Sequence, residues 1–215
     1  MSMTKPTSQM QTWSGDFGKE YTDRNIFSAV ELDASYLTDF GVTRTELNHR
    51  FLNGIERTAR ILEVGCNAGS QLLALQEMGF SCLYGIELQR YAIELAQARI
   101  KQLNLIQGSA FDIPFKDGFF ELVFTSGVLI HIHPSDVPKA LKEIHRCTAR
   151  YIWGFEYYSP KLVEVPYRGN SGLLWKTDFA KLYADMFPDL ELVKEEKVRY
   201  AGKGNVDAMF LLRKR

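Results

Sequence analysis

A short apolar run that opens into a glycine-containing turn constrains this chain more than any other feature of its sequence. Residues 61–69 read Ile-Leu-Glu-Val-Gly-Cys-Asn-Ala-Gly, with an acid, Glu63, inside the run. Small residues at the carboxyl end of a strand let a ligand approach the backbone closely, and the helix that follows directs its free N–H groups to the same place. The segment therefore predicts a crevice that holds a nucleoside-containing cofactor.

The spacing of the turn distinguishes between cofactors. Dinucleotide binding requires the pattern G-x-G-x-x-G, whereas this chain has Gly65, Asn67 and Ser70 at those positions. Glu63 would repel a pyrophosphate but attract an ammonium group, which favours a cationic amino-acid ligand. Asn67 suits the middle position because Asn adopts a positive φ more readily than most residues.

The turn resembles motif I of the Rossmann-like S-adenosylmethionine (SAM) dependent methyltransferases, and three later segments continue the resemblance. The run 83–88 ends near an acid, Glu87, about 20 residues beyond the turn, where a carboxylate accepts both ribose hydroxyls. Segment 108–115 resembles the family's G-D-A-x-x-L-P-F block, and segment 126–134 resembles its V-L-H-H-I stretch. The resemblance implies SAM as the cofactor, with these contacts: Glu63, Gly65, Asn67, Gly69, Glu87, Leu88, Ser109, Ala110, Phe111, Ser126 and Gly127.

Two positions depart from the commonest motif residues. Ser109 stands where the family has an acid, so its hydroxyl is expected to give the adenine amine a neutral, weaker hydrogen bond. Asn67 replaces a small residue of the turn. Both departures leave open a second interpretation, in which the chain binds SAM without catalysis and serves as a partner or sensor module.

Composition and charge limit the classes of partner. Lys and Arg total 26 and Asp and Glu total 26, so no overall positive field attracts nucleic acid. Segment 126–134 also lacks the N-P-P-Y or D-P-P-Y pattern usual in enzymes that methylate exocyclic amines of nucleic-acid bases. A small-molecule substrate is therefore expected, with no nucleic acid and no membrane, since no stretch reaches the roughly 18 apolar residues of a membrane span.

The cysteines and acids point to neither a disulfide framework nor a metal site. The three cysteines are odd in number and lack C-x-x-C spacing, and the acids form no recognisable ligand cluster. No signal peptide is recognisable, so we expect a cytoplasmic protein. The sequence does not indicate an oligomeric state.

The apolar periodicity predicts an α/β fold, a Rossmann-like three-layer sandwich with a mostly parallel seven-stranded sheet and a C-terminal antiparallel hairpin. A Thr43-x-x-Glu46 capping box predicts a helix before the first strand. Strands are expected near 60–64, 81–86, 104–107, 121–125, 151–155, 190–200 and 206–212, and helices near 70–78, 90–100, 135–146 and 178–186. Residues 1–215 form one predicted domain: a tail to about Met10, a lid and helices over 1–58, and a core over 59–215 with an irregular insert at about 157–176.

Two segments outside the common fold supply substrate candidates. Residues 13–25 are dense in aromatic and charged side chains and predict a lid, in which Tyr21 and Arg24 share a helix face and the guanidinium binds the SAM carboxylate. The alternative is an amphipathic helix that covers the sheet edge. The insert follows the fifth strand, on the side where ligands bind such sheets. Its tyrosines could equally pack the insert against the sheet. The candidates are Trp13, Tyr157, Tyr158, Tyr167 and Arg168.

These two segments resemble the pseudaminic acid biosynthesis-associated methylases, through W-x-x-x-F-G-x-x-Y-x-x-R-N at 13–25 and E-Y-Y followed by P-Y-R-G in the insert. The resemblance implies methyl transfer to O or N of a small polar, sugar-like metabolite in a nonulosonic acid or surface polysaccharide pathway. For a hydroxyl acceptor, the general-base candidates are His131, His133 and Glu156. The alternative for either histidine is to cap the helix that begins near Ser135 or to fill a core position.

Overall fold

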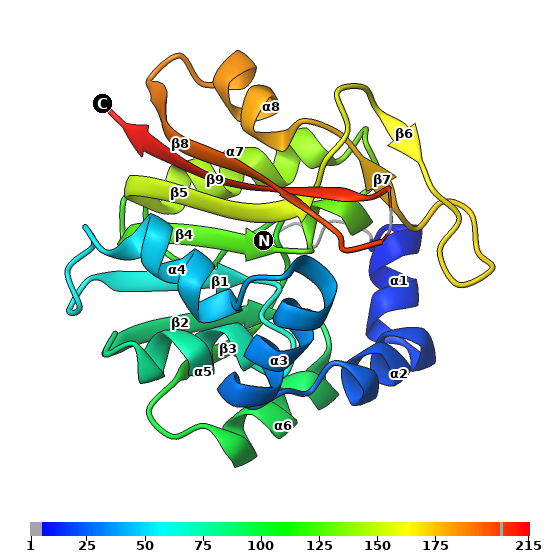
Figure 1. Cartoon of the computed structure of the whole chain (residues 1–215), viewed down its shortest axis with the longest axis horizontal. Coiled ribbons are helices and arrows are strands. Elements are labelled where there is room, and N and C mark those ends of the chain that lie inside the picture. The colour runs from blue at the N-terminus through cyan, green and yellow to red at the C-terminus, as the bar shows by residue number, and fades with distance from the viewer. Residues whose placement is uncertain (1–5, 203) are drawn as a thin grey trace.

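The computed structural model describes residues 6–202 and 204–215, which form a central sheet covered by helices on both faces (Figure 1). Seven strands pair in the order β3-β2-β1-β4-β5-β9-β8. The first five run parallel, and β9 is antiparallel to both β5 and β8. The predicted mostly parallel seven-stranded sheet with a C-terminal antiparallel hairpin is confirmed. The strands are β1 (Arg60–Val64), β2 (Cys82–Glu87), β3 (Asn104–Gln107), β4 (Phe120–Ser126), β5 (Thr148–Tyr157), β8 (Leu190–Arg199) and β9 (Val206–Lys214).

The helices of the core lie close to their predicted ranges. They are α5 (Ser70–Glu77), α6 (Arg90–Arg99), α7 (Val137–Cys147) and α8 (Phe179–Met186), preceded by α3 (Ala29–Phe40) and α4 (Arg44–Leu52). The capping box of Thr43 and Glu46 is present at the start of α4, as predicted, and Ser28 and Glu31 form a second one before α3. Helix α7 begins two residues later than predicted, with Pro138 in its first turn.

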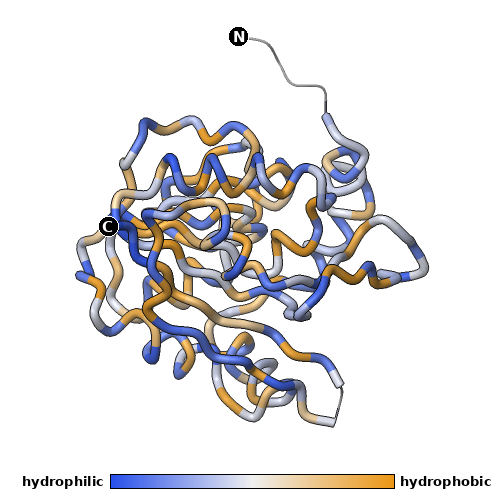
Figure 2. The backbone as a smooth tube through the Cα atoms, turned by 90° about the horizontal axis from the view of Figure 1, so that it is seen from above, coloured by the Kyte–Doolittle hydropathy of each residue, from blue (hydrophilic) through white to orange (hydrophobic). Residues whose placement is uncertain are grey.

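Alternate residues of the strands supply two separate cores. Leu62 of β1 packs with residues of α7 and α8 on one face, while its neighbour Ile61 packs with residues of α4 and α5 on the other. Along the backbone at the periphery of the molecule, hydrophobic residues alternate with hydrophilic ones, as Figure 2 shows. The sheet is buried on both faces, which leaves its edge at the carboxyl ends of the parallel strands as the place for a site.

The N-terminal region differs from the predicted tail. Helix α1 (Ser8–Ser14) begins at Ser8, where the Thr7 hydroxyl accepts a hydrogen bond from the Met10 N–H. The predicted tail to about Met10 is therefore wrong beyond residue 7, and its first five residues lie outside the described ones. Helix α2 (Asp16–Arg24) follows after Gly15, and both helices lie at the same end of the molecule as the insert (Figure 1).

The insert after β5 is not wholly irregular as expected. Strands β6 (Val163–Glu164) and β7 (Trp175–Lys176) pair antiparallel and form a two-stranded sheet of their own. The backbone between them reverses at Tyr167 and Asn170, which exchange two backbone hydrogen bonds. The insert thus has a fixed shape beside the carboxyl end of β5.

Candidate functional site

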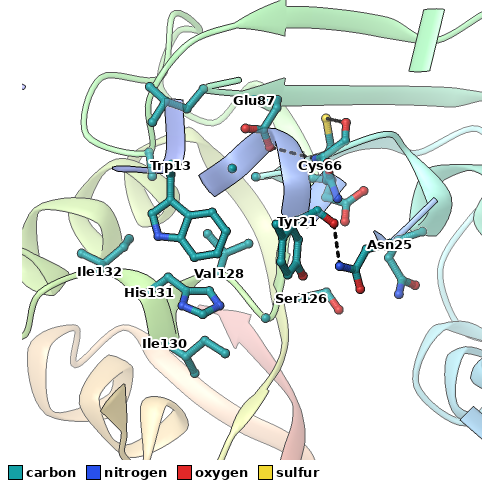
Figure 3. Close-up of a pocket in the computed structure, with 18 of the residues that line it drawn as sticks. Trp13, Tyr21, Asn25, Cys66, Glu87, Ser126, Val128, Ile130, His131 and Ile132 are labelled. Atoms are coloured by element: carbon teal, nitrogen blue, oxygen red, sulfur yellow. Dashed lines mark hydrogen bonds between the residues drawn. The ribbon is translucent and has the colours of Figure 1, made fainter. Parts of the chain in front are cut away.

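A cavity of about 390 Å³ opens at the carboxyl edge of the sheet. Its walls come from α1, α2 and α3, from the ends of β1, β2, β4 and β5, from the 3₁₀ turn η1 (Leu129–His131) and from the amino end of β9. Figure 3 shows labelled side chains from α1, α2, the ends of β2 and β4, and η1 converging on one space. Elements from nearly the whole chain therefore build the cavity.

The turn after β1 has the backbone shape that its sequence predicts. Gly65, Asn67 and Gly69 have φ values of 75°, 46° and 76°, so the expectation that Asn67 adopts a positive φ is confirmed. A Cβ atom on Gly65 would lie 2.7 Å from a methyl group of Val128. Only glycine therefore fits this approach of the turn to the loop after β4. Gly65 and Asn67 line the cavity together with Ser70 and Gln71, the first residues of α5, whereas Gly69, the N-cap of α5, is not part of the described lining.

Glu87 lies at the end of β2 with its carboxylate fixed by two backbone groups. Oε2 accepts from the Asn67 N–H at 2.9 Å and Oε1 accepts from the Gln89 N–H at 2.8 Å. Burial raises the pKa of Glu87, and these two hydrogen bonds act in the opposite direction. Each oxygen retains a further acceptor site, so the geometry suits a diol such as that of a ribose.

The next wall of the cavity consists of Leu88, Ser109, Ala110 and Phe111. Here the Ser109 hydroxyl accepts from the Phe111 N–H at 3.1 Å, which orders the loop after β3. The hydroxyl oxygen can still accept a second hydrogen bond. Ser126 and Gly127, at the end of β4, complete this part of the lining.

Glu63 is 2 % exposed, and its Oε2 has no hydrogen-bond partner among the described residues. Burial raises the pKa of this carboxyl well above its ordinary value, the Arg44 charge lowers it and the Glu87 charge raises it further. A buried acid without a partner is costly unless a cationic or donor group meets it. Glu63, Glu87 and the turn between them thus fit a ligand that carries both an ammonium group and a ribose.

Helix α2 and the end of α1, the segment expected as a lid, contribute Trp13, Gly18, Tyr21 and Thr22 to the cavity lining. Trp13 packs against Tyr21 and His131, with ring centroids 5.2 Å and 4.4 Å apart, and Figure 3 shows these three side chains together. The Trp13 indole N–H is buried without a partner among the described residues. It therefore remains available to a ligand that accepts a hydrogen bond.

Two polar side chains, Asn67 and Gln89, attach the lid to the loops after β1 and β2. The Thr22 hydroxyl donates to the Asn67 side-chain oxygen at 2.7 Å. The Gln89 amide donates to the backbone oxygens of Ser14 and Gly15, both at 3.1 Å. Asn67, which replaces a small residue in the turn, is therefore one of two residues that anchor the lid to these loops.

The structure does not bring Arg24 into the cavity, contrary to the expected clamp on a carboxylate. Its exposed guanidinium pairs with Glu20 at 3.6 Å and, among the described residues, lies outside the cavity lining. Thr22 faces the turn, and a residue two positions later lies about 200° around a helix, which directs Arg24 to solvent. Tyr21 alone of this predicted pair lines the cavity.

The three general-base candidates have different surroundings. His131 Nδ1 contacts the Leu173 carbonyl at 2.7 Å, and burial lowers the pKa of His131 to about 4. His133 lies at the exposed rim, where its Nδ1 contacts the Ser135 hydroxyl at 2.7 Å and the Ser135 N–H at 3.3 Å, outside α7, which begins at Val137. Glu156 is 1 % exposed, accepts from the Val128 N–H at 3.2 Å and, among the described residues, lies behind the lining. Burial raises the pKa of Glu156 to about 7.

The substrate candidates of the insert divide into two groups. Tyr157 and Tyr167 line the cavity, and the Tyr167 ring lies 5.2 Å from His131. Tyr158 packs under the Lys197 ammonium at 3.4 Å, and Arg168 is exposed with a φ of 50°. Neither of the latter two, among the described residues, belongs to the lining.

Most of one end of the cavity was not expected from the sequence. This end, called here the aromatic end, consists of Tyr36, Phe40, Phe155, Tyr157, Tyr200 and Asp207, of which only Tyr157 was expected. Asp207 pairs in register with Tyr157 because the antiparallel β9 begins where the parallel β5 ends. The predicted hairpin could have indicated the position of Asp207, because the last strand of such a hairpin must start at the ligand-binding edge of the sheet.

The core of the chain is similar to proteins described as methyltransferases. Residues 62–150 match a family model described as a methyltransferase domain. An uncharacterized methyltransferase of Synechocystis sp. is 29 % identical over 87 residues, 40 % of this chain and 41 % of that protein. An O-methyltransferase of Aspergillus nomiae is 31 % identical over 96 residues, 42 % of each chain. This chain thus spans about two fifths of the length of the curated relatives it matches.

Among solved structures, the 1,6-didemethyltoxoflavin-N1-methyltransferase of Burkholderia thailandensis, with bound 1,6-didemethyltoxoflavin and S-adenosylhomocysteine, has the same fold. The TM-score is 0.72 over 100 % of this chain and 92 % of that one, at 17 % identity. None of the helices in the described part of the chain is long and apolar enough to cross a membrane. Within the same residues, no group of three or more His, Cys, Asp or Glu side chains could hold a metal ion.

Proposed function

We propose that this chain, a SAM-dependent methyltransferase by its fold and by the match of residues 62–150, transfers a methyl group to O or N of a small polar, sugar-like metabolite. The observation that carries the proposal is the pair of largely buried acids, Glu63 and Glu87, on either side of the positive-φ turn. One acid suits an ammonium group and the other a ribose diol, and SAM contains both.

Different residues of the cavity would then contact different parts of the cofactor. Glu87 would accept the ribose hydroxyls, Ser109 and Phe111 would contact the base, and Glu63 would face the ammonium group. Bound SAM supplies a methyl group already activated on a sulfonium, so the transfer depends mainly on positioning the acceptor in line with it. The lid would exclude water, because Trp13 and Tyr21 lie over the same space.

The sugar-like acceptor and its pathway rest on the resemblance of residues 13–25 and of the insert to the pseudaminic acid biosynthesis-associated methylases. The aromatic and polar lining from Trp13, Tyr157 and Tyr167 supports a polar, ring-shaped acceptor. We further propose that residues 1–215 act as one domain, since helices from its first 58 residues and the last strand share one cavity. A cytoplasmic location remains part of the proposal.

Calorimetric titration with SAM, S-adenosylhomocysteine, NAD and NADP tests the cofactor. We expect micromolar binding of the first two and none of the dinucleotides, because Glu63 faces the place where a pyrophosphate would lie. Binding of NAD instead of SAM would contradict the proposal. SAM binding without methyl transfer to any of a panel of amino and neutral sugars would favour the non-catalytic sensor module.

A further inference from the structure

We propose that the methyl acceptor is an amine and that Asp207 holds its nitrogen at the aromatic end of the cavity. The inference rests on the proposed methyl transfer and decides between the O and N acceptors that the sequence leaves open. Three observations carry it: an unpartnered buried carboxylate, a wall of aromatic rings, and the charges of the cavity lining.

Asp207 is a buried carboxylate with one oxygen unused. It is 2 % exposed, and its Oδ2 accepts from the Tyr200 hydroxyl at 3.2 Å. Its Oδ1 has no hydrogen-bond partner among the described residues, although the side chain belongs to the cavity lining. Buried polar atoms nearly always have a partner, so a ligand that donates an N–H or O–H group would complete this site.

Aromatic rings cluster around Tyr200, whose hydroxyl holds this carboxylate. Phe40 lies 4.3 Å from Tyr200 and 5.8 Å from Phe155, and Tyr157 lies 6.2 Å from Tyr200, measured between ring centroids. The rings come from α3, from β5 and from the turn between β8 and β9, so folding brings them together from distant parts of the chain. Aromatic faces beside a carboxylate bind ammonium groups through both cation–π attraction and charge.

The charges of the lining select the same class of ligand. Four acids line the cavity, Asp39, Glu63, Glu87 and Asp207, and the described lining residues include no Lys or Arg. Two cations lie near this end without belonging to the described lining. Arg44 is 0 % exposed and donates to the Tyr36 hydroxyl at 2.8 Å and to Ser126 at 3.3 Å, and the Lys176 ammonium lies 5.2 Å from the centroid of the Tyr157 ring. A cavity of this sign attracts cations and opposes acceptors that carry a carboxylate or phosphate.

The groups around Asp207 also suit it to take a proton. Burial raises the pKa of Asp207 to about 7; the Tyr200 hydrogen bond lowers it, Glu156 raises it, and Lys176 and Arg44 lower it. By contrast, the pKa of His131 is lowered to about 4, which makes that ring a weak base. Asp207 is therefore better matched to an ammonium proton than His131.

The proposed step balances in protons and electrons. An acceptor ammonium gives one proton to the Asp207 carboxylate and becomes a neutral amine. The nitrogen lone pair attacks the methyl carbon of SAM, the N–C bond forms, and the C–S bond breaks with its electron pair on sulfur. The products are a methylated ammonium and S-adenosylhomocysteine. An amino sugar would meet both this requirement and the proposed sugar-like acceptor.

Matched amine and alcohol probes test the inference in the protein loaded with S-adenosylhomocysteine. We expect glucosamine and benzylamine to bind about tenfold or more tightly than glucose and benzyl alcohol, as judged by calorimetry. Asp207→Asn should remove that preference while affinity for S-adenosylhomocysteine stays within about twofold. Asp189→Asn, the same change at an acid that pairs with His145 outside the cavity lining, is the control and should leave both unchanged.

Three outcomes would overturn the inference: no binding of either amine at millimolar concentration, equal binding of amines and alcohols, or an undiminished preference in Asp207→Asn. If the wild-type protein does not bind S-adenosylhomocysteine at all, that result would instead contradict the proposed function. If Asp207→Asn does not fold, Tyr200→Phe keeps the carboxylate but removes its hydrogen bond. That variant should keep the amine preference and raise the pH midpoint of methyl transfer to the amine, and an unchanged midpoint would contradict the role of Asp207.

Discussion

The two ends of the cavity are built in different ways. One end, called here the cofactor end, consists of Glu63, Glu87 and the turn after β1. Its residues come from short continuous segments and are fixed by backbone groups, since Glu87 is held by the N–H groups of Asn67 and Gln89. At the aromatic end, side chains from α3, β5 and β9 meet, and Asp207 is held by one hydroxyl, that of Tyr200. The first end is fixed by local backbone geometry and the second by the topology of the sheet.

This difference teaches where variation in substrate can occur. The cofactor end cannot change a residue such as Gly65 without a clash with Val128, because the backbone itself forms the surface. The aromatic end consists of side chains from a helix, from two strands and from the turn between β8 and β9, so side chains and not the backbone form its surface. One fold can therefore keep its donor and change its acceptor.

The largest effect is expected at the cofactor end. Glu87→Ala should weaken S-adenosylhomocysteine binding by roughly 10- to 100-fold, since a hydrogen bond to a charged group contributes about 1.5–3 kcal/mol. Calorimetry measures the change, and Glu94→Ala, an exposed acid on α6, is the control. The 2′-deoxy form of S-adenosylhomocysteine completes the comparison. If Glu87 contacts the ribose, removing the 2′-hydroxyl from the ligand should weaken binding to Glu87→Ala much less than it weakens binding to the wild-type protein. Equal losses in the two proteins would contradict the contact.

The sequence predicts these two ends unequally, for a physical reason. A turn that needs a positive φ limits its residues to glycine and a few others, so 65–69 can be read without knowing what surrounds it. Asp207 has no such local signature. Its place depends on the pairing of β9 with β5, which the periodicity of the last 26 residues indicates only as a hairpin.

Helical phase explains the remaining misses. Tyr21 and Arg24 share a face in a helix drawn by itself, but the Thr22 contact with Asn67 fixes which face of α2 meets the loops. Arg24 then points to solvent beside Glu20. Whether a polar residue enters a site or leaves it depends on the docking of its element, and the sequence of that element does not contain this information.

A second prediction concerns His131, which packs against Trp13 of the lid and Tyr167 of the insert. Burial lowers its pKa to about 4 from the ordinary 6.5, so the unfolded chain binds its proton first as the pH falls. This residue therefore adds stability above pH 6.5, and that stability is lost between about pH 6.5 and 4. His131→Phe should remove about 2 kcal/mol of pH dependence over this interval, allowing for water in the cavity.

Urea unfolding of both proteins at several pH values measures this effect. The difference between the two curves isolates His131, because Glu156 and Asp207, whose pKa values are raised to about 7, titrate in both. Parallel curves for the two proteins would show that His131 does not titrate abnormally. The ring would then not lie buried between Trp13 and Tyr167.

A smaller effect is expected where the lid joins the cofactor end. Thr22→Val removes the hydroxyl that donates to Asn67, which should lower the free energy of unfolding by about 1 kcal/mol and weaken S-adenosylhomocysteine binding by about fivefold or less. Thr22→Ser keeps the hydroxyl and is the matched control. Equal affinity in both variants would show that the lid does not need this contact to close over the cofactor.

The smallest effect distinguishes the two parts of the lid. Arg24→Ala removes an exposed partner of Glu20, so stability and S-adenosylhomocysteine affinity should change by less than about 0.5 kcal/mol. The guanidinium makes its ion pair along the helix surface, away from the cavity that Tyr21 lines. A loss of tenfold or more in affinity, measured by calorimetry, would mean that α2 rotates when the cofactor binds and brings Arg24 to its carboxylate. The cofactor end would then be completed by a movement of the lid, whereas unchanged affinity would mean that its loops already have their final form.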